Sequence, residues 1–392
     1  MKNGKADEIV REEYLVFGEP TIGDEEISAV ADVLRSRWIG QGPRVKEFET
    51  RFAAYKSAPH AVAVSSCTAA LELALRASDI RPGDEVITTP LTFCATANAI
   101  LNVGGRPVLA DVDPLTQNID ASAVASAVTS RSRAIVPVHF AGRMCRMGEI
   151  MDVARRHGLS VIEDCAHAIE TSSGLGHAGA IGNFGCFSFY VTKNITCGEG
   201  GMVLCKNAEQ AARLSRLALH GMTRDAWKRF GDPSRMEYVV EEVGYKANMT
   251  DIEAAIGLAQ LSRVEERYGR RCDIWQAYME AFSDLPIGLP APVDAGERHA
   301  FHLFTIQIDE RACGRSRPQV AARLRTANIG SGIHYRALPE HPAYQERLGW
   351  RPEHTPHATK IGRQTLSIPL SAGMSDADVA DVVSAVRSAL WH

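Results

Sequence analysis

The sequence contains no run of about 18 consecutive apolar residues, the length that a membrane-spanning helix requires. Its first residues, MKNGKADEIVREEY, are polar and charged and lack the apolar segment of a secretion signal. Blocks of like charge are also missing, and the formal net charge is only −4. A basic block is what binding to nucleic acid or anionic lipid requires. We therefore expect a cytoplasmic protein with small-molecule partners, no nucleic acid and no membrane.

The sequence is equally poor in metal-site and disulfide patterns. It has nine cysteines, but no two form a CxxC pair and none lies at the Cys/His spacing of a zinc site. Their odd number argues against a disulfide framework. We expect no metal site, and reduced cysteines that serve mainly in packing.

The first two thirds of the chain, by contrast, alternate regularly between short β-rich segments and helical patterns. Continuous apolar strands between amphipathic helices are typical of a mostly parallel sheet covered on both faces. The pattern predicts an α/β fold with a seven-stranded sheet, whose strands lie near residues 61–64, 85–89, 107–113, 134–140, 159–166, 186–190 and 201–205.

A second pattern follows towards the C-terminus. Residues 221–243 are polar and contain Gly and Pro, which indicates a loop, and a helical apolar pattern then continues for about thirty residues. A smaller α+β pattern ends the chain, with strands expected at 303–308, 332–335 and 365–370 and helices near 317–326 and 375–390. We expect a large domain at 1–255, including an N-terminal arm, and a smaller domain at 256–392, reached through the long helix.

One glycine motif, GLGHAG at 174–179, matches the GxGxxG fingerprint of dinucleotide-binding folds, and Glu199 follows it at a suitable distance. That fingerprint must follow a strand directly and open a helix. Here ETSS precedes it and AIGNFG follows, a glycine-rich sequence that does not favour a helix. We therefore reject a dinucleotide site.

Three groups of reactive side chains fall at the ends of predicted strands. Asp164 closes one strand, Lys193 follows another, and Ser65, Ser66 and Thr68 follow a third where a helix begins. Each has an ordinary structural explanation: a surface lysine, an aspartate that caps a turn, and hydroxyls that cap a helix. In open α/β sheets, however, ligands bind beyond the carboxyl ends of the strands, so the three groups are expected to face one crevice.

Together these groups match the requirements of pyridoxal phosphate. A helix N-terminus suits the phosphate, a carboxylate pairs with the protonated pyridine nitrogen, and a lysine forms the Schiff base and moves the substrate proton. Phe93, which follows the strand at 85–89, is a candidate to stack on the ring, although plain core packing explains it equally well.

Six segments, in this order, resemble the signature blocks of the DegT/DnrJ/EryC1/StrS sugar aminotransferases, which are fold-type I pyridoxal phosphate enzymes. They are SSCTAALELAL, GDEVITTPLTFCATANAI, EDCAHA, FSFYVTKNITCGEGGMV, GYKANMTDIEAAIGLAQL and IPL. The similarity runs from about 17–30 to 367–379, nearly the whole chain.

The resemblance implies a role for each matching residue. Lys193 would be the Schiff-base lysine, Asp164 the partner of the pyridine nitrogen and Phe93 the stacking aromatic. The cofactor's phosphate would be held by Ser66, Cys67, Thr68 and Ser188. Family members are typically homodimers with sites at the subunit interface, so Asn248 would reach the phosphate of the neighbouring subunit.

The chain departs from the family pattern at three positions. Cys67 replaces the usual glycine, which puts the closest approach of the backbone to the phosphate in doubt. His167 replaces a common glutamine; it could still bond the cofactor's 3-oxygen, and its protonation would then affect the cofactor's charge. Ala247 replaces a frequent tyrosine and should open space beside Lys246 and Asn248.

The identity of residue 193 predicts the reaction class. A branch of the family that removes a sugar hydroxyl has histidine there, so Lys193 favours transamination. The GEGG loop with Glu199 resembles members that act at C4 of nucleotide-linked 4-keto sugars. We expect L-glutamate, or glutamine, to convert the cofactor to pyridoxamine phosphate, and a nucleotide-activated keto-sugar to accept the amine.

Candidate substrate contacts lie in two other segments. Cations at 220–230 could meet a diphosphate, and residues at 334–336 could approach the sugar or the amino donor; ordinary solvated side chains are the alternative for the charged ones. The candidates are Arg224, Lys228, Arg229, His334, Tyr335 and Arg336. Two other functions stay open: a keto-cyclitol aminotransferase of aminoglycoside-type biosynthesis, and a non-catalytic regulator that binds pyridoxal phosphate or a sugar.

Overall fold

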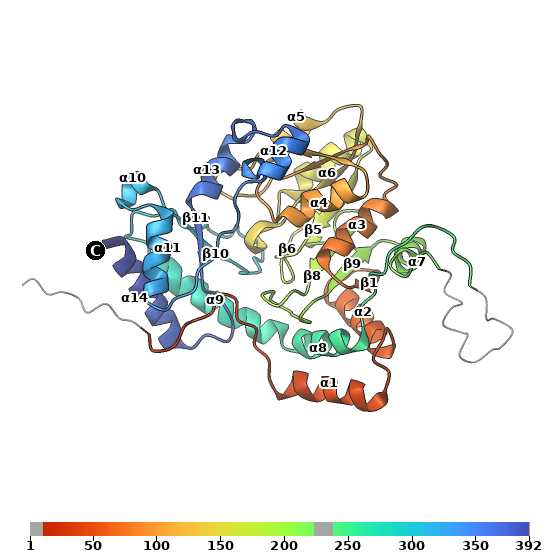
Figure 1. Ribbon diagram of the computed structural model, residues 1–392, viewed down its shortest axis with the longest axis horizontal. Helices are drawn as coiled ribbons and strands as arrows, with labels where there is room; N and C mark the ends of the chain where they lie inside the picture. The colour runs from red at the N-terminus through yellow and green to blue at the C-terminus, as the bar shows by residue number, and fades with distance from the viewer. Residues whose placement is uncertain (1–10, 223–237, 392) are drawn as a thin grey trace, which may run out of the picture.

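A seven-stranded sheet forms the centre of the molecule (Figure 1). The computed structural model describes residues 11–222 and 238–391. The strand order is β1-β9-β8-β5-β4-β2-β3; β9 is antiparallel to both of its neighbours, and the other pairs are parallel. The strands are β1 (His60–Val64), β2 (Glu85–Thr88), β3 (Arg106–Leu109), β4 (Ser132–Val136), β5 (Ser160–Asp164), β8 (Phe184–Ser188) and β9 (Gly201–Cys205). The prediction of a mostly parallel, seven-stranded α/β sheet is confirmed.

Alternation along the strands divides the core between the two faces of the sheet. In β1, Ala61 and Ala63 join one apolar cluster, while Val62 and Val64 join the other. The first cluster includes side chains of α2 (Pro43–Tyr55), α5 (Ala121–Ala127), α6 (Met147–His157) and α8 (Asp251–Ser262). The second includes side chains of α3 (Cys67–Ala77), α4 (Cys94–Asn102) and α7 (Ala208–Leu217). Helices therefore cover both faces.

Local sequence signals set several helix ends. Thr250 and Glu253 form a capping box at the start of α8, in which the Thr250 hydroxyl accepts from the Glu253 amide and the Glu253 carboxylate accepts from the Thr250 amide. Asn207 caps α7 through its side chain. Gly158 ends α6 at φ +63°, a conformation that glycine adopts without strain.

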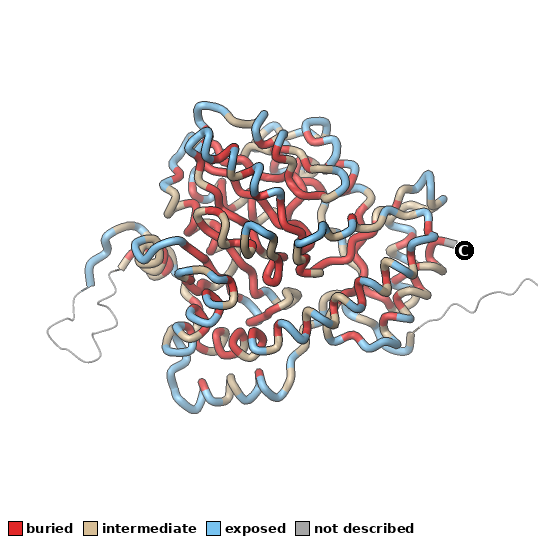
Figure 2. Tube along the Cα trace, turned by 180° about the vertical axis from the view of Figure 1, so that it is seen from behind, coloured by how far each residue is buried: buried red, intermediate tan, exposed pale blue. Residues whose placement is uncertain are grey.

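A third apolar cluster lies beyond the sheet and gathers the C-terminal elements (Figure 2). It is built from α9 (Val264–Ala281), β10 (Phe304–Gln307), α11 (Arg317–Thr326), β11 (Thr365–Ile368) and α14 (Asp376–Trp391), with α10 (Glu310–Cys313) beside it. The expected long helix is two helices, because it breaks at Arg263. α8 packs on the sheet unit beside α1 (Asp24–Ser36), and α9 enters the third cluster (Figure 1). The division into domains at 255 stays a prediction.

The expected strand at 332–335 is wrong. Only Gly332 pairs with β11, through a single bridge to Ser367, and the chain then leaves the small sheet. The following segment, with α12 (Pro342–Leu348) and α13 (Pro356–Gln364), packs Ala337 and Ile361 against Leu91 near the carboxyl end of β2. The C-terminal part thus folds back over the edge of the large sheet.

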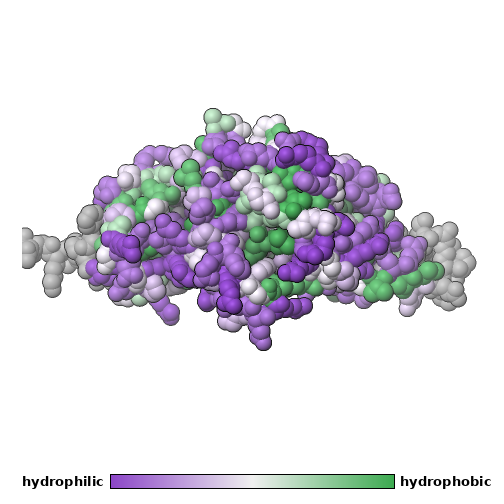
Figure 3. All heavy atoms as spheres, turned by 90° about the horizontal axis from the view of Figure 1, so that it is seen from above, coloured by the Kyte–Doolittle hydropathy of each residue, from purple (hydrophilic) through white to green (hydrophobic). Residues whose placement is uncertain are grey.

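The GLGHAG segment does not open a helix. It belongs to a short hairpin of β6 (Ser172–Ser173) and β7 (Gly176–His177), which supports rejecting the dinucleotide site. No helix within 11–222 and 238–391 combines the length and apolarity needed to span a lipid bilayer. Seen from above, the surface is largely hydrophilic with smaller apolar patches between (Figure 3).

Candidate active site

A cavity of about 600 Å³ lies where β1, β5 and β8 end and where the segment after β2 begins. Its wall contains most of the residues that the sequence singled out: Ser66, Cys67, Thr68, Phe93, Asp164, His167, Ser188, Lys193, Glu199, His334 and Tyr335. The parallel strands bring their carboxyl ends to one edge, so residues far apart in sequence meet there. The folded-back segment supplies the last two of these residues.

The start of α3 forms the side of this cavity that best suits an anion. Ser66 caps the helix, and its Oγ accepts the Ala69 amide at 3.1 Å, while Cys67 and Thr68 occupy the first turn. A helix N-terminus carries partial positive charge from its unpaired amides and attracts phosphate. A Cβ on Gly201 in β9 would lie 2.4 Å from the Ser66 carbonyl oxygen, so β9 needs glycine to pass this close.

Ser188 ends β8 beside that helix start. It is buried, and its Oγ accepts the Tyr190 amide at 3.3 Å. The hydroxyl proton is still available to a ligand, because this contact uses only a lone pair. Ser188 and the α3 N-terminus line the same cavity, which makes them a suitable set of donors for a phosphate group.

Asp164 is fixed at the bottom of the cavity by hydrogen bonds to both of its carboxylate oxygens. Thr96 Oγ1 donates to Oδ2 at 2.9 Å, and the Ala166 amide donates to Oδ1 at 3.1 Å. Burial raises the pKa of Asp164, while these two bonds and the nearby Lys193 charge oppose the rise. A buried carboxylate that is held by such hydrogen bonds favours a cationic N–H partner.

Lys193 follows β8 and points its amine into the same cavity. Burial lowers the pKa of Lys193 to about 8, although Cys67 and Asp164 oppose the effect. A fraction of this amine is therefore neutral and nucleophilic near neutral pH. Lys193 Nζ also lies 3.5 Å from His302 Nε2.

His167 has both ring nitrogens engaged. The Ala141 amide donates to Nδ1 at 3.2 Å, so the neutral ring carries its proton on Nε2, which lies 3.0 Å from Tyr335 Oη. Burial and the positive charge of Lys193 hold the pKa of His167 well below its usual value. His167 is therefore neutral, and its Nε2 hydrogen bonds to Tyr335. The expected bond to a cofactor oxygen stays a prediction.

Residues of the C-terminal part close the cavity from the opposite side. His334 Nδ1 lies 2.8 Å from Ser367 Oγ, and burial lowers the pKa of His334 to about 4. The ring of Tyr335 lies 6.1 Å from that of Phe93, centroid to centroid. Phe93 lines the cavity but is 59% exposed, so its free face is available for stacking.

Several predicted residues lie away from this wall. Asn248 forms a bridge with Val64 and accepts a hydrogen bond from Lys246 Nζ, but it does not line the cavity of its own chain. Arg336 is exposed and does not line the cavity either. Ala247 is buried in an apolar cluster. Arg224, Lys228 and Arg229 lie outside the described residues, so their role as phosphate contacts stays a prediction.

Sequence reasoning missed two residues of the site. Thr96 holds Asp164, and His302 lies against Lys193. Thr96 lies three residues after Phe93 in the segment FCATANA, so a closer comparison of this segment with the family could have identified it. His302 precedes β10 in the C-terminal part, and no spacing in the sequence links it to Lys193.

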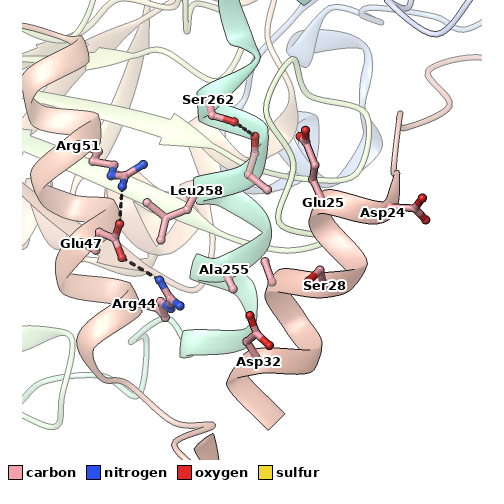
Figure 4. Close-up of a pocket in the computed structure, with 12 residues that line it drawn as sticks. Asp24, Glu25, Ser28, Asp32, Arg44, Glu47, Arg51, Ala255, Leu258 and Ser262 are labelled. Atoms are coloured by element: carbon pink, nitrogen blue, oxygen red, sulfur yellow. Dashed lines mark hydrogen bonds and ion pairs between the residues drawn. The ribbon is translucent and has the colours of Figure 1, made fainter. Parts of the chain in front are cut away.

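A second cavity of about 590 Å³ is an open groove between α1, α2 and α8 (Figure 4). Its charged side chains on α2 are already paired: Glu47 accepts from Arg44 at 3.1 Å and from Arg51 at 2.7 Å. Asp24, Glu25 and Asp32 on α1 face solvent around it. The groove therefore lacks the convergent reactive groups of the first cavity.

The sequence is similar to other proteins over nearly its whole length. The profile of the DegT/DnrJ/EryC1/StrS aminotransferase family matches residues 20–387. The spore coat polysaccharide biosynthesis protein SpsC of Bacillus subtilis is 47% identical, over 96% of this chain and 97% of SpsC.

Solved structures agree. The putative sugar aminotransferase Spr1654 from Streptococcus pneumoniae, in its PMP form, superposes with a TM-score of 0.90 at 32% identity, covering 96% of this chain and 98% of Spr1654. A PLP form of Spr1654 is also known. Helicobacter pylori PseC, an aminotransferase of pseudoaminic acid biosynthesis, superposes with a TM-score of 0.89 at 26% identity, covering 97% and 99% of the two chains.

These similarities confirm the predicted fold, a sugar aminotransferase as the enzyme class, and pyridoxal phosphate as the cofactor. They also decide against a non-catalytic regulator. The chain belongs to the DegT/DnrJ/EryC1/StrS aminotransferase family.

Proposed function

We propose that this sugar aminotransferase transfers the amino group of L-glutamate, or L-glutamine, to C4 of a nucleotide-activated 4-keto-6-deoxy sugar. The relatives named for spore coat polysaccharide and pseudoaminic acid biosynthesis support a sugar acceptor over a cyclitol. The observation that carries the chemistry is the convergence of Lys193, Asp164 and the α3 N-terminus in one cavity. Glu199 in the GEGG loop lies in the wall of that cavity, where it would contact the acceptor.

The residues present fit pyridoxal phosphate. Ser66, Cys67, Thr68 and Ser188 would hold the phosphate, because the α3 amides and three hydroxyl groups converge there. The buried Asp164 would pair with the pyridine N–H, and Phe93 would cover one ring face. When bound, the cofactor supplies an electron sink for the negative charge that develops as a proton leaves the substrate carbon.

Lys193 would carry the cofactor covalently and then move the substrate proton. Because its pKa is about 8, the freed amine is neutral in part of the molecules near neutral pH and accepts the proton from the donor's α-carbon. In the acceptor half-reaction the protonated Lys193 would deliver a proton to the sugar carbon that receives the amine. Asp164, held by Thr96 and Ala166, keeps its orientation during both steps.

We also propose a homodimer in which the partner's Asn248 completes the phosphate site. Large apolar side chains are exposed on α1 (Ile27 and Leu34), in the cavity wall (Phe93 and Tyr190) and in the segment after residue 238 (Val243). Their burial against a second copy would remove this apolar surface from water. Light scattering after gel filtration measures the mass; a monomer of 42.6 kDa at assay concentrations would contradict the proposal.

The test of function is product mass. Holoenzyme is incubated with L-glutamate or L-glutamine and, in separate reactions, a nucleotide 4-keto-6-deoxy sugar or a keto-inositol, and products are resolved by mass spectrometry. Amination of the sugar nucleotide, with the amine located at C4 by NMR, is the expected result. Amination of the keto-inositol alone, or of neither acceptor, would overturn the proposal.

Lys193→Ala is the matched control for the cofactor assignment. Sodium borohydride should abolish the long-wavelength absorbance of the wild-type holoenzyme and attach the cofactor to the peptide that contains Lys193. In the variant no such attachment is expected. Borohydride-stable attachment to another residue would show that the lysine assignment is wrong.

A further inference from the structure

His302 is a second histidine within the cavity region, next to Lys193. It precedes β10, is 7% exposed, and its Nε2 lies 3.5 Å from Lys193 Nζ. Its ring also lies 4.5 Å from that of His167, centroid to centroid. None of the six segments that carry the family resemblance includes His302, and its relation to Lys193 is a feature of the tertiary structure.

The other nitrogen of His302 is held by Asn194, the residue after Lys193. His302 Nδ1 lies 3.0 Å from Asn194 Oδ1. The amide of Asn194 has one orientation, because its Nδ2 donates to Glu170 Oε2 at 2.8 Å and to the Ala300 carbonyl at 2.9 Å. Its oxygen therefore faces the histidine and accepts from Nδ1–H.

Glu170 is in turn fixed by Arg271 of α9. Arg271 Nη2 donates to Glu170 Oε1, and both side chains are almost fully buried, at 3% and 1% exposure. Arg271 also donates to the Ala300 carbonyl at 3.4 Å. The buried chain thus runs from α9 through Glu170 and Asn194 to His302 and ends at the Lys193 amine.

This chain determines the tautomer of His302. With the proton on Nδ1, Nε2 presents a lone pair towards Lys193. Asn194 is uncharged, so it does not stabilise an imidazolium as a carboxylate would, and burial together with Lys193 holds the pKa of His302 well below its usual value. His302 is therefore a neutral acceptor.

We propose that His302 is a positioning residue for Lys193: its Nε2 accepts one N–H of the amine and so directs the nitrogen lone pair into the cavity, while Asn194 fixes the histidine tautomer. The inference rests on the proposed role of Lys193. A neutral amine has two N–H bonds and one lone pair, so holding one N–H restricts where the lone pair points. Holding a reacting atom in the correct orientation increases the reaction rate by a large factor.

The test measures the pKa of Lys193 without turnover. The holoenzyme is placed in its pyridoxamine phosphate form, in which Lys193 is not linked to the cofactor. Trace acetylation with acetic anhydride is followed at each pH by mass spectrometry of the peptide that contains Lys193. Other groups that face this pair stay unchanged in the comparison: Cys67, Asp164, His167, Arg271, His299 and His334.

His302→Leu is expected to lower the pKa of Lys193 by about one unit, because an acceptor stabilises the ammonium more than the neutral amine. His302→Gln, whose amide oxygen replaces Nε2 as an acceptor, should restore most of the wild-type value. Asn194→Leu frees Nδ1 and lets the histidine carry its proton on Nε2, so it should lower the pKa of Lys193 similarly. The double variant should then shift it no further.

In turnover, His302→Leu should lower kcat by about 10-fold to 100-fold with little change in KM, since a misdirected amine slows proton transfer but not binding. An unchanged Lys193 pKa in His302→Leu would overturn the inference. An equal decrease of the Lys193 pKa in the Leu and Gln variants would overturn it too. The Lys193→Ala borohydride experiment and the product-mass assay are independent of this test. Cofactor attached to another residue would remove the proposed role of Lys193, and a missing aminated sugar would remove the proposed function, whatever the His302 variants show.

Discussion

Thr96 Oγ1 donates a 2.9 Å hydrogen bond to Asp164 Oδ2, and this bond lies within the buried floor of the active-site cavity. Thr92 Oγ1 lies 2.9 Å from the same Thr96 oxygen, so two threonines of the segment before and within α4 support one carboxylate of β5. The segment after β2 thus supports a carboxylate at the end of β5, two strands away in the sheet, which is the group proposed to pair with the cofactor ring.

Removing the hydrogen bond between Thr96 and Asp164 should shift the pH at which kcat/KM falls on the acid side. Thr96 lowers the pKa of Asp164 against the rise caused by burial, so Thr96→Val should raise this pKa further. Protonated Asp164 pairs poorly with a pyridinium, and the pH below which kcat/KM falls should therefore move upward. The pH profile of kcat/KM is measured between pH 4 and about 8 with enzyme that has been reconstituted with pyridoxal phosphate. Thr96→Ser, which keeps the hydroxyl, is the control; equal profiles for Val and Ser would contradict the explanation.

The amination rate should rise with pH through the lysine titration. The pKa of Lys193 is about 8, lowered by burial, and only the neutral amine accepts the substrate proton. Single-turnover conversion of the cofactor by L-glutamate should thus increase through about pH 8, where half of the amine is neutral, and level off roughly one to two pH units higher. Stopped-flow absorbance at each pH measures this rate. A rate that is flat across that range would show that the lysine proton does not limit the step.

Gly201 is expected to tolerate no side chain. In Gly201→Ala the new Cβ would lie 2.4 Å from the Ser66 carbonyl and 2.8 Å from the Cys67 amide nitrogen, which pushes β9 away from the start of α3. We expect a loss of about 1–3 kcal/mol in the free energy of unfolding and weaker cofactor binding. Gly174→Ala is the matched control, because a Cβ there meets nothing within 4 Å. Urea unfolding of the two variants measures the difference; equal stabilities would contradict the steric argument.

The Arg271–Glu170 pair should be costly to break. Both partners are buried, so Glu170→Gln leaves the guanidinium without its counter-charge, and a loss of about 3–5 kcal/mol is expected. The exposed pair of Arg35 and Asp32 on α1 is the control, since Asp32→Asn should change stability by less than about 1 kcal/mol. Denaturant unfolding of both variants provides the measurement. Similar small effects would mean that water reaches the Glu170 site.

The cofactor side of the site was predictable because it depends on strand ends. Asp164 ends one apolar strand and Lys193 follows another, and the carboxyl ends of parallel strands share one edge, so their proximity follows from the pattern. Ser66 and Thr68 mark a helix start in the same way. The segment at 332–335 was mispredicted as a strand, because its apolar residues pack against the large sheet and the cavity and form no ladder.

By itself, the sequence determined the seven strands of the sheet and the groups proposed to meet the cofactor, because these depend on local patterns and on a common strand edge. Only the tertiary structure decided which groups support them. Tyr335 reaches His167 across 168 residues of sequence, and His302 reaches Lys193 across 109. Local propensity carries no information about such contacts, since they arise when the C-terminal part packs over the sheet and buries the polar groups that must then find partners.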